Sequence, residues 1–315
     1  MSDFPELPLS EWVESKETLH RFLQVVGKIR LAASVRRNHW WNVPFHVTGR
    51  GVTSRPMGQA DGNPVFTVDF DFVSHEVQVT VLDGRRTTIP LVGRSVAAFH
   101  DGVHRALADL GVRVAVPHDN PFDLPDAERP FSEDDEHAAY DPFWVNRYWQ
   151  VLSRVNLLLE EFSAGFTGKV SPVHHFWHTF DIAATRFGPN LVEQPREAGS
   201  VVREAYSQDV VSSGFWFGDD AMPEPAFYSY TAPEPDGIAA QELRPAEASW
   251  VPQSRGGHLA ILRYADVRTA PDPQARVLEF YESAYRAGAR LSGWDVDALA
   301  CPRGITDPVL QLHGR

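Results

Sequence analysis

The stretch VFTVDFDFVSHEVQVTVLDG, residues 65–84, decides the fold class of this 315-residue chain. Large apolar residues occupy every second position in both of its halves: Phe66, Val68, Phe70 and Phe72, then Val77, Val79 and Val81. A period of two predicts strands with one buried face. Asp83-Gly84 is a strong hairpin signal before a third run, Thr87 to Leu91. The stretch therefore predicts an antiparallel meander.

Amphipathic helices are predicted on both sides of this meander and again in the second half of the chain, because apolar residues recur there at intervals of three and four. Ser10 is the expected cap of the first helix and Ser95 of the second. Asp141-Pro142 and Asp272-Pro273 are expected to open the third and fourth, with proline at the first helical position. The four apolar stripes run from Leu19 to Ala33, from Val96 to Leu110, from Trp144 to Phe162 and from Val277 to Leu291.

The second half also contains runs rich in aromatic and β-branched residues, which predict strands. These runs are Val173 to Phe187, Tyr206 to Phe217, Ala226 to Thr231 and His258 to Tyr264. Both halves thus read helix, strands, helix, and we expect an α+β protein with two pseudo-repeats, each an antiparallel sheet with flanking helices. The expected boundaries are residues 1–116 and 142–300 for the repeats, with an acidic, proline-rich connection at 117–141 and a tail at 301–315.

Short matching tracts support the duplication. His39-Trp40-Trp41-Asn42 follows the first helix, and His175-Phe176-Trp177-His178 follows the third. The alternative is that any two segments of this architecture share such patterns. If the duplication is real, the second repeat is the better place for a site, because it has the longer loops.

Composition excludes several classes of protein. The chain has 29 Lys and Arg against 42 Asp and Glu, a net charge of −13, and its densest basic cluster, Arg36-Arg37 with Lys28 and Arg30, is too small for a nucleic-acid footprint. No apolar run approaches the length of a membrane span, and no secretory signal is expected at the N-terminus. Cys301 is the only cysteine, so a reducing cytoplasm is the expected compartment.

Three histidines lie in the run Val173 to Asp181: His174, His175 and His178. One interpretation is a metal-dependent enzyme that uses His174 with nearby carboxylates, because imidazole and carboxylate suit zinc or iron. The alternative is histidines satisfied by backbone groups or water. The spacing matches no diagnostic metal motif, so we assign no metal ligand and leave the cofactor unknown.

A second interpretation needs no metal, because titratable and aromatic residues gather in the same region. The candidate catalytic residues are His174, Asp181, Glu204 and Tyr206, and the candidate ligand-binding residues are Trp177, Arg186 and Trp216. The alternative is an ordinary network of salt bridges and core contacts. A regular strand over Val173 to Phe187 would split the set between two faces, and only a bulge or sharp twist would bring it together. Arg186 and its counterpart Arg50 have a structural alternative as well, as partners of carboxylates such as Asp71.

Several tracts resemble a bacterial family without an established activity, the domain of unknown function 5996. They are Leu19–Arg30, Asn38–Pro44, Glu136–Pro142, Gly168–His174, Arg203–Ser207, Gly214–Trp216 and Pro225–Tyr228. The resemblance implies a soluble bacterial protein and carries no cofactor or catalytic residue. This chain departs from the usual family pattern at Gln208-Asp209 and at His178, which weakens a metal site built on those positions.

The function we expect is the binding of a small molecule in a polar, aromatic-lined cleft of the second repeat. The acid–base residues there would also allow enzymatic chemistry. Two alternatives stay open: the metal-dependent enzyme described above, and a scaffold or interaction protein with no ligand. Neither nucleic acid nor a membrane is expected as a partner.

Overall fold

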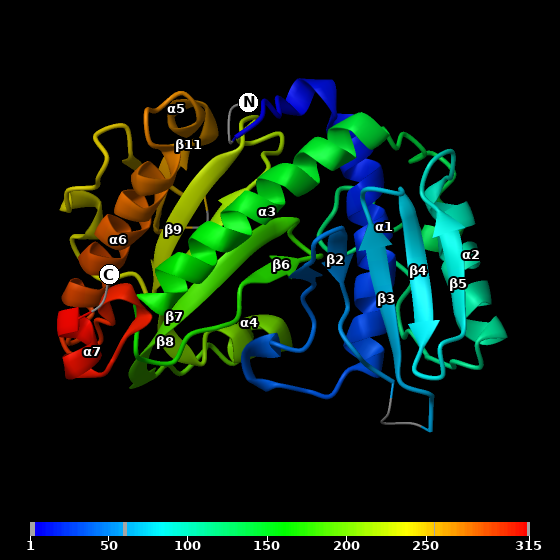
Figure 1. Cartoon of the computed structure of the whole chain (residues 1–315), viewed down its shortest axis with the longest axis horizontal. Helices are drawn as coiled ribbons and strands as arrows, with labels where there is room; N and C mark the ends of the chain where they lie inside the picture. The colour runs from blue at the N-terminus through cyan, green and yellow to red at the C-terminus, as the bar shows by residue number, and fades with distance from the viewer. Residues whose placement is uncertain (1–3, 59–61, 255, 314–315) are drawn as a thin grey trace. The chain divides into compact units, whose positions relative to one another are not determined.

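The computed structural model describes residues 4–58, 62–254 and 256–313 (Figure 1). It confirms a mixed α+β protein with two antiparallel sheets, which fit the two-repeat description. The chain divides into two compact units. The N-terminal unit contains Pro5–Ser153 with His175–Asp181, and the C-terminal unit contains Met1–Phe4, Arg154–His174 and Ile182–Arg315. The boundaries that we expect for the repeats stay a prediction.

The sheet of the N-terminal unit has five strands in sequence order, each antiparallel to the next. They are β1 (His46–Val47), β2 (Gly51–Thr53), β3 (Phe66–Asp71), β4 (Glu76–Val81) and β5 (Arg86–Pro90). Phe66, Val68 and Phe70 are buried on β3, as the alternation predicts. Two helices, α1 (Val13–Ala33) and α2 (Val96–Asp109), lie side by side behind β3, β4 and β5 (Figure 1). Phe22 of α1 stacks on Phe99 of α2, with ring centroids 4.2 Å apart.

The cap predicted at Ser10 is wrong. Leu9–Glu11 form a short 3₁₀ turn, and α1 begins only at Val13, after Trp12. Trp12 is buried and cannot cap through a side-chain oxygen, so tertiary burial rather than a capping residue sets the start of this helix.

The other three predicted caps are confirmed. Each side-chain oxygen accepts a hydrogen bond from a backbone N–H of the helix it precedes: Ala98 N to Ser95 Oγ at 3.2 Å, Phe143 N to Asp141 Oδ1 at 2.8 Å, and Ala275 N to Asp272 Oδ1 at 3.0 Å. The last two open α3 (Pro142–Ala164) and α6 (Pro273–Leu291).

The second sheet has six strands in the order β10-β11-β9-β8-β7-β6. They are β6 (His174–Phe176), β7 (Asp181–Leu191), β8 (Gln208–Trp216), β9 (Ala226–Ala232), β10 (Ser249–Pro252) and β11 (His258–Arg263). Helix α6 packs on β8, β9 and β11 and buries Phe280 and Tyr281, whose hydroxyl donates to Gly214 O at 3.0 Å. Short helices complete the chain: α4 (Ser200–Ala205), α5 (Tyr264–Arg268) and α7 (Pro308–His313). None of the helices described is long and apolar enough to cross a membrane.

The prediction of one continuous strand over Val173 to Phe187 is wrong. The chain turns at Trp177–Phe180, between β6 and β7. Within the N-terminal unit, the indole Nε1 of Trp177 donates to Val43 O at 3.0 Å. Its ring lies so close to α1 that a Cβ on Gly27 would come within 2.3 Å of it. Phe180 takes a left-handed φ of 59° and stacks on Tyr148. Tertiary packing thus overrides the strand propensity of this aromatic segment.

The predicted strand from Tyr206 to Phe217 begins two residues later than expected. β8 starts at Gln208, Tyr206 is the C-cap of α4, and Glu204 lies on α4 itself. The sequence Arg203-Glu204-Ala205 carries no strand-forming residue, so the short helix agrees with local propensity.

Candidate functional site

A basic pocket of about 270 Å³ lies in the N-terminal unit, at the C-terminal end of α1. We call it the Arg30 pocket. Its lining includes three arginines, Arg30, Arg37 and Arg55, together with the buried His46. The lining also includes Ser34, Asn42 and Trp41 and the apolar side chains of Val35, Met57 and Val65. No Asp or Glu is among the described residues of this lining.

Hydrogen bonds to Asn42 hold the loop that forms one wall of the pocket. The buried Asn42 donates from Nδ2 to Ser34 Oγ at 2.9 Å, and its Oδ1 accepts from the Arg37 backbone N–H at 3.2 Å. The Ser34 hydroxyl donates in turn to Asn42 O at 3.3 Å. One buried amide therefore fixes both ends of the loop and the backbone of Arg37.

Arg30 is the most unusual residue of the pocket because its side chain is almost fully buried, with 4% exposed. Its Nε donates to Pro44 O at 2.8 Å. Burial, and after it the positive charge of nearby Arg55, lower the pKa of Arg30 to about 10. The guanidinium is still charged at neutral pH. In the described parts of the chain no carboxylate forms an ion pair with Arg30, Arg37 or Arg55.

Backbone strain gathers around the same pocket. His39, Trp40 and Arg55 have left-handed φ angles of 52°, 60° and 59°. Such angles are costly for residues other than glycine, above all for a bulky one, and they gather at functional sites. The guanidinium of Arg36 lies over the Trp40 ring, 3.3 Å from its centroid. This cation–π contact offsets part of the cost of the left-handed backbone at Trp40.

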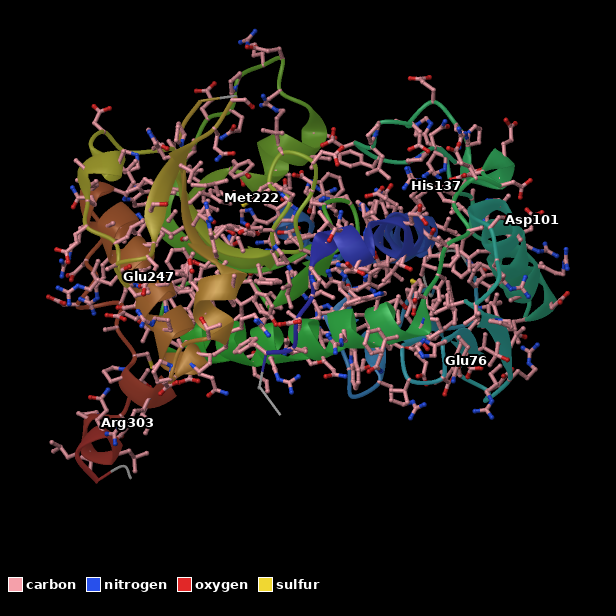
Figure 2. The ribbon with its side chains drawn as sticks, turned by 90° about the horizontal axis from the view of Figure 1, so that it is seen from above. Glu76, Asp101, His137, Met222, Glu247 and Arg303 are labelled. Atoms are coloured by element: carbon pink, nitrogen blue, oxygen red, sulfur yellow. The ribbon has the colours of Figure 1, made fainter. Side chains whose placement is uncertain are left out.

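The pocket contrasts with the chain as a whole, whose net charge is −13. Acidic side chains such as Asp101 and Glu247 extend outward from the ribbon (Figure 2) and are exposed. A buried cation with a second cation beside it is normally compensated by a carboxylate or by a ligand.

The residues predicted as a site from the sequence are divided between the two units. Trp177 and Asp181 belong to the N-terminal unit, where Trp177 is buried against α1 and Asp181 accepts a hydrogen bond from the Thr179 hydroxyl. His174, Arg186, Glu204, Tyr206 and Trp216 belong to the C-terminal unit. The Arg30 pocket contains none of them, and their joint role in a site stays a prediction.

Arg186 lies in an aromatic cage. Its guanidinium stacks on Phe162 at 3.7 Å and on Tyr285 at 4.2 Å from the ring centroids. It donates to Phe162 O at 2.5 Å and lies 3.6 Å from a carboxylate oxygen of Glu282. Burial lowers its pKa to about 10, and Glu282 opposes that shift. These contacts are those of a structural arginine.

Three other predicted residues lie at element ends of the C-terminal unit. His174 is fully buried at the start of β6, and Trp216 is the half-buried last residue of β8. The Tyr206 hydroxyl lies 3.1 Å from that of Tyr230.

Arg50, the counterpart of Arg186, binds Asp71 at 2.5 Å, as the structural alternative predicts.

The neighbouring His175 is unsuited to a metal. Its Nδ1 donates to Asp181 O at 2.9 Å, and its Nε2 accepts from the Tyr148 hydroxyl at 2.5 Å. Both ring nitrogens are therefore engaged, and burial lowers the pKa of His175 to about 4. The residue acts as a neutral bridge inside the core.

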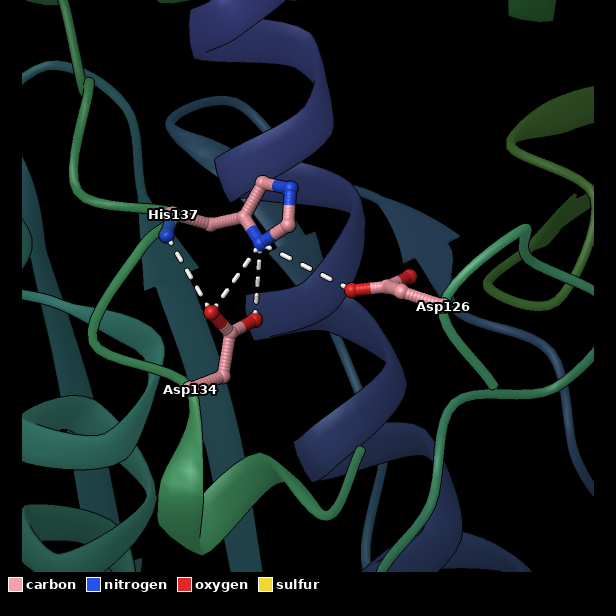
Figure 3. A group of neighbouring side chains, drawn as sticks. All are labelled: Asp126, Asp134 and His137. Carbon is pink, nitrogen blue, oxygen red and sulfur yellow. Dashed lines mark hydrogen bonds and ion pairs between the residues drawn. The ribbon is translucent and has the colours of Figure 1, made fainter. Parts of the chain in front are cut away.

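In the described part of the chain, the group that most resembles a metal site consists of Asp126, Asp134 and His137 (Figure 3). His137 Nδ1 lies 2.8 Å from Asp134 Oδ2. Two arginines already neutralise the carboxylates: Arg21 lies 2.6 Å from Asp126, and Arg129 lies 3.3 Å from Asp134. Burial would raise the pKa of Asp126, but the hydrogen bond and charge of Arg21 lower it overall. The group is a charge network that ties α1 to the acidic connection.

A second pocket, of about 490 Å³, is lined by the start of α1 and by Ala139–Asp141. Its charged residues are carboxylates, and two polar groups of its lining have hydrogen-bond partners within the protein. Asp141 N donates to Ser15 Oγ at 2.8 Å, and the Tyr140 hydroxyl lies 3.2 Å from His75 Nδ1. The described lining of this pocket therefore lacks the buried positive charge that favours a ligand in the Arg30 pocket.

Sequence reasoning missed the Arg30 pocket although two signals were present. The basic cluster of Lys28, Arg30, Arg36 and Arg37 served only to exclude nucleic acid, and the aromatic tract Asn38–Asn42 served only as a mark of duplication. Arg55 joins them from the next loop, a proximity that the sequence does not reveal.

The comparisons with known proteins give a family but no activity. No curated protein and no solved structure matches this chain. The sequence model described as "Family of unknown function (DUF5996)" matches residues 4–301, nearly the whole length. The chain therefore belongs to this family of unknown function.

Proposed function

We propose that this protein binds a small organic anion in the Arg30 pocket. The observation that carries the proposal is a buried guanidinium, Arg30, in a concave site that also holds Arg37 and Arg55 and no described carboxylate. The proposal keeps the small-molecule binding expected from the sequence and moves its position to the N-terminal unit.

The physical reason is the cost of an uncompensated buried charge. Removing a cation from water costs several kcal/mol, and the Pro44 carbonyl offers Arg30 only one neutral hydrogen bond. Arg55 adds repulsion. An anion in the pocket would offset both costs, because each guanidinium can offer paired N–H donors to a carboxylate or phosphate.

The pocket is also preorganised for binding by hydrogen bonds within the protein. Asn42 fixes the loop, and Pro44 fixes the side chain of Arg30. A ligand therefore has little ordering to impose, which favours affinity. Trp41, Val35 and Met57 supply an apolar wall beside the charges, as in other small-molecule sites.

The experiment is a calorimetric titration of the full-length protein at low ionic strength with benzoate and with phenyl phosphate. We expect saturable binding of at least one of them. Because charge-assisted contacts contribute about 1.5–3 kcal/mol, Arg37→Gln and Arg55→Gln should each weaken that binding by roughly 10- to 100-fold. Both side chains are exposed, so these variants should fold.

The matched control is Arg86→Gln, which removes an exposed arginine on β5, away from the pocket lining. It changes the net charge equally and should leave affinity unchanged. Absence of binding by both anions, or equal affinity in all three variants and the parent, would refute the proposed function.

A further inference from the structure

We infer that the ligand of the Arg30 pocket is a small phosphomonoester, a refinement that rests on the proposed function. The inference concerns the charge, the number of acceptor oxygens and the organic part of the ligand.

The charge of the site exceeds that of a single carboxylate. Arg30, Arg37 and Arg55 supply three positive charges, and no Asp or Glu in the described lining offsets them. The Arg55 charge acts directly on Arg30. A phosphomonoester carries about −1.5 to −2 at pH 7, whereas a carboxylate or sulfate ester carries only one negative charge. The dianion is the better match.

The donors of the site are also more numerous than two carboxylate oxygens can accept. Each guanidinium has five N–H groups. At Arg30 only Nε has a hydrogen-bond partner among the described residues, the Pro44 oxygen. Three guanidiniums that line one pocket could together serve the three terminal oxygens of a phosphate, each a strong acceptor.

The uncharged wall calls for an ester rather than free phosphate. Trp41, Val35, Met57 and Val65 line the same pocket, and inorganic phosphate has no apolar part that could pack against them. A flat ring attached to the phosphate could lie against the Trp41 indole, which is half-buried. The volume of about 270 Å³ suits one phosphorylated ring.

Three probes separate these features in calorimetric titrations at pH 7.5 with the full-length protein. The probes are phenyl phosphate, phenyl sulfate and inorganic phosphate. Phenyl sulfate differs from phenyl phosphate in its charge, and inorganic phosphate differs from it by lacking the ring. We expect phenyl phosphate to bind at least about tenfold more tightly than phenyl sulfate, the singly charged analogue of the same shape. Phenyl phosphate should also bind more tightly than inorganic phosphate. Trp41→Ala should reduce the difference in affinity between these two probes.

Each contrary result has a distinct meaning. Equal affinities for phenyl sulfate and phenyl phosphate, both lost in Arg55→Gln, would overturn the phosphomonoester and leave anion binding in place. Equal affinities for inorganic phosphate and phenyl phosphate would overturn the ester. Failure of all three probes, together with benzoate, would remove the proposed function itself.

Discussion

The Nε atom of Arg30 donates a hydrogen bond to the carbonyl oxygen of Pro44 at 2.8 Å. This bond joins the last turn of α1 to the segment before β1 and holds a buried guanidinium in the wall of a pocket. A buried arginine is usually compensated by a carboxylate, as Arg21 is by Asp126. Arg30 has Arg55 as its charged neighbour instead. On the function we propose, that difference distinguishes a structural cation such as Arg21 from one that receives an anion.

Replacing Asn42 by alanine should loosen the pocket. The variant loses the side-chain hydrogen bonds to Ser34 and to the Arg37 backbone, and it leaves the Arg37 N–H without that acceptor. We expect a loss of about 1–3 kcal/mol in the free energy of unfolding, measured in urea, and weaker binding of phenyl phosphate. The exposed Asn38→Ala is the control. Unchanged stability and affinity in Asn42→Ala would contradict this account of the loop.

Gly27→Ala should destabilise the N-terminal unit. The added Cβ would lie 2.3 Å from the Trp177 ring, which is held by its bond to Val43 O. Overpacking of this kind costs about 1–3 kcal/mol. Urea unfolding, with Gly49→Ala as the control because nothing lies within 4 Å of its Cβ position, measures the effect. Equal stability of the two variants would show that Trp177 can move away from α1.

The tryptophan also illustrates what the sequence could predict about the fold. Helical stripes and the β3–β5 meander follow from local periodicity, and the structure confirms them because one buried face per element enforces the pattern. The turn at Trp177–Phe180 does not follow, since it contains no Gly, Pro or Asn. Its left-handed Phe180 is held by stacking on Tyr148, a contact between residues 32 positions apart in the sequence.

The candidate site was also hard to predict, because it depends on contacts between residues that are far apart in the sequence. Arg30, Arg37 and Arg55 come from a helix and two loops, and only the fold shows that they share a concave surface without a described carboxylate. Density of titratable residues favoured the region from His174 to Tyr206 instead. Much of that chemistry is bonded internally, as the cage around Arg186 shows. The site that we propose rests on charge without compensation, which residue type alone does not reveal.

Metal should not bind tightly at Asp126, Asp134 and His137. Arg21 and Arg129 already neutralise the two carboxylates, and a divalent cation would have to displace them. Titration with zinc or manganese is expected to show no stoichiometric binding there, and chelator treatment should leave the melting temperature unchanged. One equivalent of metal per chain that disappears in Asp134→Asn would contradict this prediction.

Acid should destabilise the protein partly through His20. Burial lowers its folded-state pKa from 6.5 to about 3, so the unfolded chain binds a proton that the folded chain does not. Its contribution to stability is complete above about pH 6.5 and is lost as the pH falls toward 3, at up to about 1.4 kcal/mol per pH unit.

His20→Gln should therefore flatten the fall in unfolding free energy between pH 6.5 and 4.5. The change in the exposed His118→Gln is expected to be negligible by comparison. Urea midpoints at three pH values measure the slopes. Parallel slopes for the parent and His20→Gln would show that His20 is protonated in the folded state.

A crystal structure of the full-length protein with phenyl phosphate would show whether the Arg30 pocket receives an anion. We expect phosphate density within hydrogen-bonding distance of the Arg30 guanidinium, with the phenyl ring against Trp41, Val35 or Met57. Density at another surface, or an empty pocket at a phenyl phosphate concentration that saturates the protein in solution, would contradict it.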